Sequence, residues 1–155
     1  MRQALFDMLM HAPWAAGGIQ GAAVADIFAG TGALGLEALS RGAASCVFVE
    51  QDRAALAALR ANIAACRAGE TARVLAQDAL RVAKGPACDL VFLDPPYGQA
   101  LVTRAVTALT TAGWITPTTL IASETGRDEA LELSAEPLAE RAHGAARVTI
   151  WRPAA

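Results

Sequence analysis

The chain has 155 residues, of which 54% are hydrophobic and 18% are charged, so it can fill the core of one domain and is not a disordered chain. Its apolar runs are far shorter than the roughly 18 residues that a membrane helix needs, and its first residues lack the apolar core of a signal peptide. We therefore expect a soluble, cytoplasmic protein with one domain over residues 1–155. The formal net charge of -2 is unfavourable for binding nucleic acid, because Lys and Arg contacts to phosphate supply much of that affinity.

The predicted elements begin with a short amphipathic helix over Arg2–Met10, where Leu5, Phe6 and Leu9 recur at helical spacing. From Ala23 onward, short apolar runs alternate with longer alanine-rich or amphipathic segments, which is typical of a parallel α/β sheet. The predicted strands lie near Val24–Phe28, Cys46–Glu50, Arg73–Ala76, Leu90–Leu93 and Leu120–Ser123. The predicted helices between them lie near Leu34–Arg41, Arg53–Arg67 and Gln99–Ala112.

The last part of the chain is less regular. Only Arg147–Trp151 alternates between polar and apolar residues like a half-buried strand, and it could close the sheet edge in antiparallel fashion.

The cysteines do not indicate a metal or a disulfide framework. Cys46, Cys66 and Cys88 are odd in number, widely spaced and without a C-x-x-C pair. We expect them to be small buried residues, and we expect no metal site.

A glycine-rich segment follows the first predicted strand and precedes a predicted helix. Gly30, Gly32 and Gly35 form the pattern G-x-G-x-x-G, which in this context predicts a nucleotide-binding turn. Its backbone amides at the helix start can receive a carboxylate or a phosphate. The glycines alone do not identify the ligand.

Three acidic residues narrow the choice of cofactor. Glu50 ends the second predicted strand, where a carboxylate can accept hydrogen bonds from both ribose hydroxyls, a diol that NAD and S-adenosylmethionine share. Asp26 lies inside the first strand, and its burial would be compensated by the ammonium of a methionine moiety but not by a pyrophosphate. Asp78 follows the third strand, where it could accept a hydrogen bond from the adenine amino group. Together they favour S-adenosylmethionine.

The fourth predicted strand leads directly into Asp94-Pro95-Pro96-Tyr97, at the sheet edge where open α/β sheets bind ligands. The Asp94 carboxylate and the Pro95 carbonyl could accept both hydrogens of an exocyclic amino group and so direct its nitrogen lone pair at a methyl donor. Tyr97 could stack on a flipped-out base. The motif therefore predicts catalysis at these four residues.

These residues resemble the RsmD family of small-subunit ribosomal RNA guanine-N(2)-methyltransferases, and the similarity covers nearly the whole chain. It includes the opening helix Arg2–Leu9, the segment Asp26–Ala43, the strand end Phe48–Glu50 and the motif Asp94–Tyr97. Within the second segment, Leu36–Ala43 is much more specific to the family than either short motif.

The resemblance implies a Rossmann-like α/β class I methyltransferase fold: a mostly parallel seven-stranded sheet with an antiparallel strand near the C-terminus and helices on both faces. It also implies that the substrate is ribosomal RNA, within a small ribosomal subunit or its assembly intermediate, and that the cofactor is S-adenosylmethionine. Glu124, after the fifth predicted strand, matches a family glutamate whose role the sequence does not define. The implied cofactor-binding residues are Asp26, Gly30, Gly32, Glu50 and Asp78, and the implied catalytic residues are Asp94, Pro95, Pro96 and Tyr97.

Family members begin with a basic, glycine-containing segment ahead of this helix, and the present sequence starts within the region that follows. The loss of such a segment would explain part of the acidic balance and would affect RNA binding more than the cofactor pocket. We expect a monomer. The basic residues that could contact phosphate, or simply form a solvated face, are Arg41, Arg53, Arg60, Arg67, Arg73, Arg81 and Lys84.

Three alternatives remain open at this stage. Methylation of adenine in DNA or RNA would use the same carboxylate and carbonyl. Methylation of a protein glutamine usually involves a motif that begins with Asn, where this chain has Asp94. A nicotinamide-dependent oxidoreductase or a non-catalytic nucleotide-binding module would use the glycines and Glu50 but would leave Asp26 and Asp94–Tyr97 unexplained.

Overall fold

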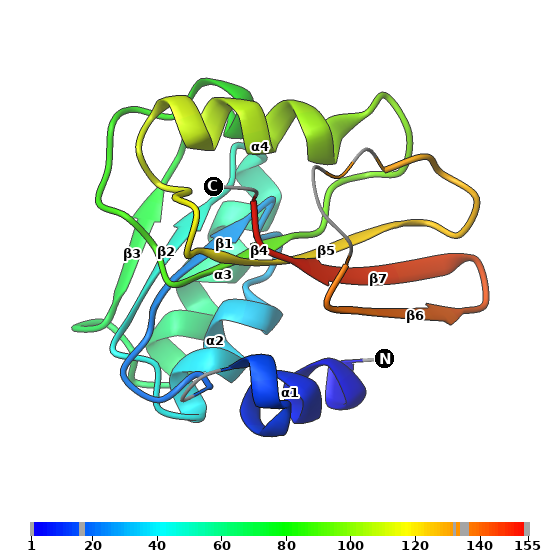
Figure 1. The fold of residues 1–155 in the computed structure, drawn as a ribbon. Coiled ribbons are helices and arrows are strands. Elements are labelled where there is room, and N and C mark those ends of the chain that lie inside the picture. The colour runs from blue at the N-terminus through cyan, green and yellow to red at the C-terminus, as the bar shows by residue number, and fades with distance from the viewer. Residues whose placement is uncertain (1, 16–17, 132, 134–136, 154–155) are drawn as a thin grey trace.

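A single seven-stranded sheet dominates the computed structural model, which describes residues 2–15, 18–131, 133 and 137–153 (Figure 1). The strands are β1 (Ala23–Ile27), β2 (Ser45–Val49), β3 (Ala72–Leu75), β4 (Leu90–Leu93), β5 (Leu120–Gly126), β6 (Ala139–His143) and β7 (Ala146–Trp151). The helices are α1 (Arg2–His11), α2 (Ala33–Ser40), α3 (Arg53–Ala65) and α4 (Leu101–Thr111), with short 3-10 turns η1 (Pro13–Ala15) and η2 (Ala79–Arg81).

The sheet has the strand order β3-β2-β1-β4-β5-β7-β6. β1 to β5 pair in parallel, and β7 runs antiparallel to both β5 and β6. The chain moves outward from β1 through β2 to β3 and then returns to the other side of β1 to form β4. Such a reversal opens a crevice at the carboxyl ends of the two strands beside it, here β1 and β4. The mostly parallel sheet with one antiparallel strand confirms the predicted fold class.

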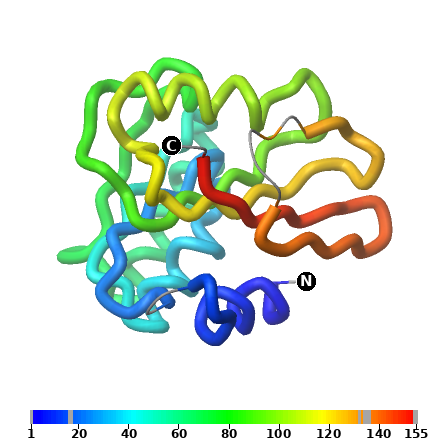
Figure 2. The backbone as a smooth tube through the Cα atoms, viewed as in Figure 1, coloured from blue at the N-terminus to red at the C-terminus, as the bar shows by residue number. Residues whose placement is uncertain are grey.

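Helices cover both faces of the sheet because the central strands are apolar on both sides. Every residue of β4 is buried. Phe92 packs with the buried residues of α1, α2 and α3, whereas Val91 and Leu93 pack with those of α4. Figure 1 shows α4 above the sheet and α1 and α2 below it, and Figure 2 traces the same chain path as a smooth tube.

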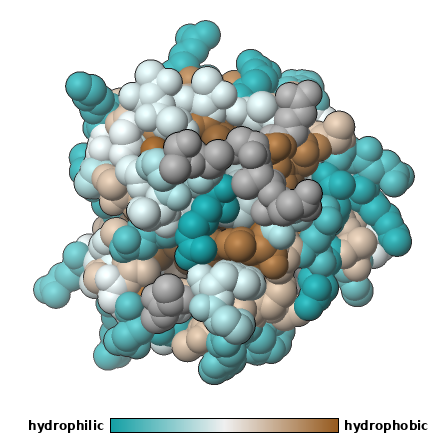
Figure 3. All heavy atoms as spheres, viewed as in Figure 1, coloured by the Kyte–Doolittle hydropathy of each residue, from teal (hydrophilic) through white to brown (hydrophobic). Residues whose placement is uncertain are grey.

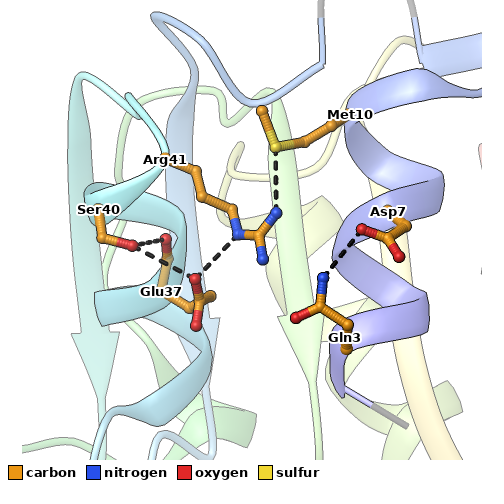
Figure 4. Close-up of polar contacts among 6 residues, drawn as sticks. All are labelled: Gln3, Asp7, Met10, Glu37, Ser40 and Arg41. Atoms are coloured by element: carbon orange, nitrogen blue, oxygen red, sulfur yellow. Dashed lines mark hydrogen bonds and ion pairs between the residues drawn. The ribbon is translucent and has the colours of Figure 1, made fainter.

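Arg41, the residue that follows α2, contacts both α1 and α2 (Figure 4). Its Nε pairs with Glu37 at 2.9 Å, and one terminal nitrogen lies 3.3 Å from the sulfur of Met10. The guanidinium carbon also lies 5.0 Å from the centre of the Phe6 ring, a cation–π distance. Arg41 was one of the basic residues considered for phosphate, but here it joins two helices.

The sequence predictions for the sixth strand and for Cys66 need correction. β6 was missed because its residues are mostly exposed and lack a repeating apolar position; backbone pairing with β7 defines it. Cys66 is exposed, not buried, because it caps α3 beyond the last buried residue of that helix, Ile63. Cys46 and Cys88 are buried as expected.

β5 is longer than predicted. It continues to Gly126 because Glu124, Thr125 and Gly126 pair with β7, so Glu124 lies inside the strand rather than after it. This extension carries a carboxylate to the crevice edge of the sheet.

The surface shows where polar side chains gather. In Figure 3, polar side chains (teal) project around the edge that carries β6 and β7, and some apolar surface (brown) shows at the centre of this face.

Among the described residues, no helix is both long enough and apolar enough to span a bilayer.

Gly35 allows α2 to approach the sheet closely, and this gives a test of the fold. A Cβ at this position would collide with the ring of Phe48 and would lie 2.7 Å from the sulfur of Cys46. We expect Gly35→Ala to lower the free energy of unfolding by about 1–3 kcal/mol, as overpacking of a core does. Denaturant unfolding would measure it. Gly69→Ala is the matched control, since a Cβ there meets nothing within 4 Å; equal stability of the two variants would contradict the packing role.

Candidate active site

The glycine turn and the second strand are joined by one carboxylate. Glu50 follows β2, and its Oε1 accepts a hydrogen bond from the Gly30 amide at 2.8 Å. Its Oε2 accepts from the amides of Gln51 and Asp52 at 3.0 and 2.9 Å. Gly32, with a φ of 86°, then makes the left-handed turn into α2, which L side chains rarely adopt. Glu50 is thereby fixed at the crevice, where Oε1 retains a lone pair for a ligand while both acceptor sites of Oε2 are used.

Asp26 lies beneath the glycine turn and is 1% exposed. Its Oδ2 accepts a hydrogen bond from the Gly35 amide at 2.9 Å. Burial raises the pKa of Asp26 to about 7; the Gly35 bond opposes this shift, and the charges of Asp94 and Glu50 add to it. Asp26 therefore connects β1 to α2. The predicted contact with the ammonium of a cofactor stays a prediction.

One pocket, of about 470 Å³, brings together three of the predicted acidic residues, Glu50, Asp78 and Asp94. Its volume is within the range of about 300–1,000 Å³ that is usual for small-ligand sites. Asp78 holds its place by accepting a hydrogen bond from the Leu80 amide at 2.9 Å. We call this the Glu50 pocket. Its other lining residues are Phe28, Val49, Gln51, Asp52, Gln77, Ala79, Leu80, Pro96, Gln99, Leu101 and Arg104.

A second pocket, of about 260 Å³, opens between α1 and the ends of β4 and β5. We call it the α1 pocket. Asp94 lines both pockets and so stands where they meet. The other residues that line the α1 pocket are Arg2, Leu5, Ala33, Leu34, Leu93, Ala122, Ser123, Glu124 and Val148.

Asp94 itself is paired with a second carboxyl group. Desolvation by partial burial, a hydrogen bond with Glu124 and the charge of Glu124 together raise the pKa of Asp94 to about 7. The Tyr97 hydroxyl donates to Oε2 of Glu124 at 3.3 Å, while 51% of Tyr97 is exposed. Pro95 is buried, which fixes the backbone between the carboxylate and the exposed ring.

The loop after Tyr97 is strained and anchored. Gly98, Gln99 and Ala100 have φ values of 89°, 60° and 52°, and the last two are uncommon for residues with a Cβ. The Gly98 amide donates to the side chain of Glu129 at 2.7 Å. Such strain persists only where surrounding contacts hold it, and it is frequent at functional sites.

Sequence reasoning missed part of the site. Glu124 was noted without a role, since its neighbours in space are 27 and 30 positions away. Arg104, in α4, also lines the Glu50 pocket, but no sequence motif marks it as a site residue. Phe28 lines the same pocket and could have been predicted, because it lies between β1 and the glycine turn. Among the described residues, no group of three or more His, Cys, Asp or Glu side chains is arranged to hold a metal ion.

The strand order, the glycine turn after β1 and the acidic residue after β2 define the class I S-adenosylmethionine-dependent methyltransferase fold. A solved RNA methyltransferase from Salinibacter ruber, in complex with S-adenosyl-L-homocysteine, has this fold: it superposes with a TM-score of 0.71 at 16% identity, over 98% of this chain and 92% of that one.

The family can also be identified. Residues 1–152 match the family described as Conserved hypothetical protein 95, and the chain belongs to this family. It is 40% identical over 123 residues to ribosomal RNA small subunit methyltransferase D of Escherichia coli (strain K12). The aligned residues cover 78% of this chain and 59% of that protein. A solved conserved hypothetical protein of Streptococcus pyogenes superposes with a TM-score of 0.83 at 30% identity, over 99% of this chain and 95% of that one. The family resemblance inferred from the motifs is thus confirmed, although the match spans less than two thirds of the Escherichia coli protein.

The raised pKa of Asp26 predicts how stability depends on pH. The folded state binds this proton up to a pH of about 7 and the unfolded state only up to about 3.8, so stability falls as the pH rises through that interval. Asp26→Asn retains an acceptor for the Gly35 amide and removes the titration. We expect it to raise the melting temperature at pH 8 by several degrees and to have a smaller effect at pH 5.

Thermal unfolding at the two pH values measures this difference. Asp128→Asn, on an exposed loop residue, is the control and should give no pH-dependent difference. A gain from Asp26→Asn that is the same at both pH values would contradict the assignment.

Proposed function

We propose that this chain transfers a methyl group from S-adenosylmethionine to the exocyclic 2-amino group of a guanine in small-subunit (16S) ribosomal RNA. The observation that carries the proposal is the position of Asp94 in the wall shared by the Glu50 pocket and the α1 pocket. A group at that position can face a cofactor and a substrate together. Membership of a family that includes ribosomal RNA small subunit methyltransferase D supports the choice of substrate.

The cofactor is assigned to the Glu50 pocket. The free lone pair on Oε1 of Glu50 suits a ribose hydroxyl, and Asp78 suits the adenine amino group. Gly30 and Gly32 keep the turn close to the ligand, and Asp26 lies buried below the turn with one oxygen bound to the Gly35 amide. S-adenosylmethionine supplies an electrophilic methyl group on a cationic sulfur, and an acidic pocket favours a cation.

Asp94 and Pro95 then prepare the nucleophile. The nitrogen of an exocyclic amino group is a poor nucleophile because its lone pair is delocalised into the ring. When a carboxylate oxygen of Asp94 and the carbonyl of Pro95 accept its two hydrogens, the nitrogen becomes more pyramidal and its lone pair is directed at the methyl donor. The nitrogen must lose one proton as the new bond forms. Asp94, with a pKa of about 7, can accept that proton near neutral pH.

Pro96 and Tyr97 place the base. Pro96 lines the Glu50 pocket and continues the rigid turn that begins at Pro95. The exposed ring of Tyr97 offers a surface on which a flipped-out base can stack, a contact worth about 1–3 kcal/mol per base in single-stranded nucleic acid complexes. Orientation and exclusion of water therefore account for catalysis without a covalent intermediate.

The charge of the chain bears on how it docks to RNA. The chain is slightly acidic, so an assembled small subunit or assembly intermediate, whose proteins add docking surface, is the proposed partner rather than naked RNA. Arg53, Arg60, Arg67 and Arg73 are exposed and can contact phosphate. We propose that the chain acts as a monomeric, cytoplasmic, single domain.

The first test is transfer of labelled methyl from S-adenosylmethionine to unmethylated small ribosomal subunits, naked ribosomal RNA and DNA, followed by nucleoside chromatography. We expect the label in 2-methylguanosine from small subunits. Label in methyladenine would show that the target base is adenine and not guanine, and label in protein would indicate glutamine methylation. Titration with S-adenosylmethionine and NAD tests the cofactor, and tighter binding of NAD would contradict the assignment.

A second test separates chemistry from binding. Asp94→Ala should lower methyl transfer to small subunits by at least about 100-fold while it changes the affinity for S-adenosylmethionine only a few fold, because Asp94 is assigned to the amino group being methylated. The rate is measured in single turnover and the affinity by calorimetry. Asp128→Ala, outside both pockets, is the control. Equal loss of rate and affinity would make Asp94 a cofactor-binding residue.

A further inference from the structure

Glu124 occupies a position that the methyl-transfer chemistry alone does not explain. It lies inside β5 on the same face as Ala122, half-buried, and lines the α1 pocket beside Asp94. Its carboxyl group contacts both residues that are assigned to the base, because it hydrogen-bonds with Asp94 and accepts the hydroxyl of Tyr97. Glu124 thus lies beside both of the residues that are assigned to the base.

The carboxyl group of Glu124 forms no ion pair with a described residue, since neither of the two ion pairs among the described residues includes it. Its Oε2 receives the Tyr97 hydroxyl, and its other oxygen has no described hydrogen-bond donor apart from the carboxyl group of Asp94. A partly buried carboxylate with unused acceptor capacity favours a ligand that presents a hydrogen-bond donor.

Purine bases differ at the atom next to the exocyclic amino group. In guanine the 2-amino group is flanked by N1–H, which is a donor, so its edge presents a row of donors. In adenine the 6-amino group is flanked by N1, which is an acceptor. A carboxylate beside the amino-binding site therefore gains a hydrogen bond with guanine and faces a lone pair with adenine.

We propose that Glu124 accepts the N1–H of the target guanine and so selects guanine over adenine, while Asp94 and Pro95 hold the 2-amino group. This inference rests on the proposed function and adds a residue that determines the base. The α1 pocket, at about 260 Å³, is smaller than the usual range of small-ligand sites and suits part of one base. Its apolar walls, such as Leu5 and Leu34, can exclude water from the paired edge.

The test uses two synthetic probes that need no RNA docking. Each is an adenosine whose 5′ carbon is joined by the same linker either to N2 of guanine or to N6 of adenine, and binding is measured by calorimetry. We expect the wild-type protein to bind the guanine probe about 100-fold more tightly, since a hydrogen bond to a charged group is gained in one case and a repulsion is met in the other.

Glu124→Gln should reduce this ratio to less than about tenfold, because the amide can donate to adenine N1. Its affinity for S-adenosylhomocysteine should stay within a few fold of the wild-type value. An unchanged ratio in Glu124→Gln, or a wild-type ratio near one, would overturn the inference. So would an equal loss of affinity for S-adenosylhomocysteine and for the guanine probe, which would place Glu124 in the cofactor site.

Two control variants test whether Glu124 contacts the base directly or acts only through Tyr97 or the loop that follows it. Tyr97→Phe removes the hydroxyl that Glu124 accepts but keeps the stacking ring, so it should preserve the ratio. Loss of the ratio in this variant would mean that Glu124 acts only by holding Tyr97. Glu129→Gln removes a carboxylate that contacts the same loop at Gly98 but does not line the α1 pocket, and it should also preserve the ratio.

The labelled product distinguishes this inference from the proposed function. If small subunits yield 2-methylguanosine but Glu124→Gln keeps its preference for the guanine probe, the inference fails and the proposed function stands. If wild-type protein yields methyladenine instead, both fail.

Discussion

The carboxyl groups of Asp26, Glu50, Asp94 and Glu124 converge near the carboxyl ends of β1, β2, β4 and β5. The rest of the site depends on how the repulsion between these four groups is offset. Backbone amides neutralise part of it: Asp26 accepts from Gly35, and Glu50 accepts from the glycine turn and from the two residues that follow it. Burial, together with the repulsion that remains, raises the pKa values of both Asp26 and Asp94 to about 7. The sheet therefore carries an electrostatic cost at its functional edge, which a cationic ligand would relieve.

This cost gives a physical reason for the proposed cofactor. A sulfonium and an ammonium are both cations, and both would be attracted by the acidic crevice, whereas a pyrophosphate would be repelled. The same glycine turn serves dinucleotides in other proteins, so the turn alone does not discriminate between cofactors. In the proposed site, the discrimination comes from the acidic groups Asp26 and Asp94, because they make the crevice favour a cation.

The walls of the α1 pocket depend on contacts outside the crevice. Arg2 and Leu5 belong to α1, a helix that the sheet topology alone does not hold in place. Arg41 fixes it by reaching from the end of α2 to Met10 and over Phe6, whose ring packs against Phe92 of β4 at 5.7 Å between centroids. Arg41 thus supports the shape of the α1 pocket through its contacts with α1.

The sequence by itself determined the local features: the strands β1 to β5, the glycine turn, the acidic residue at the end of β2 and the D-P-P-Y motif, because each depends on residues close in the chain. It did not determine β6, the length of β5 or the pairing of Asp94 with Glu124. Those features depend on contacts between distant segments: β7 extends β5, and the parallel register of β4 with β5 brings the two carboxyl groups together. Only the tertiary structure could decide them, because a hydrophobic pattern specifies which residues are buried but not which charged residues meet.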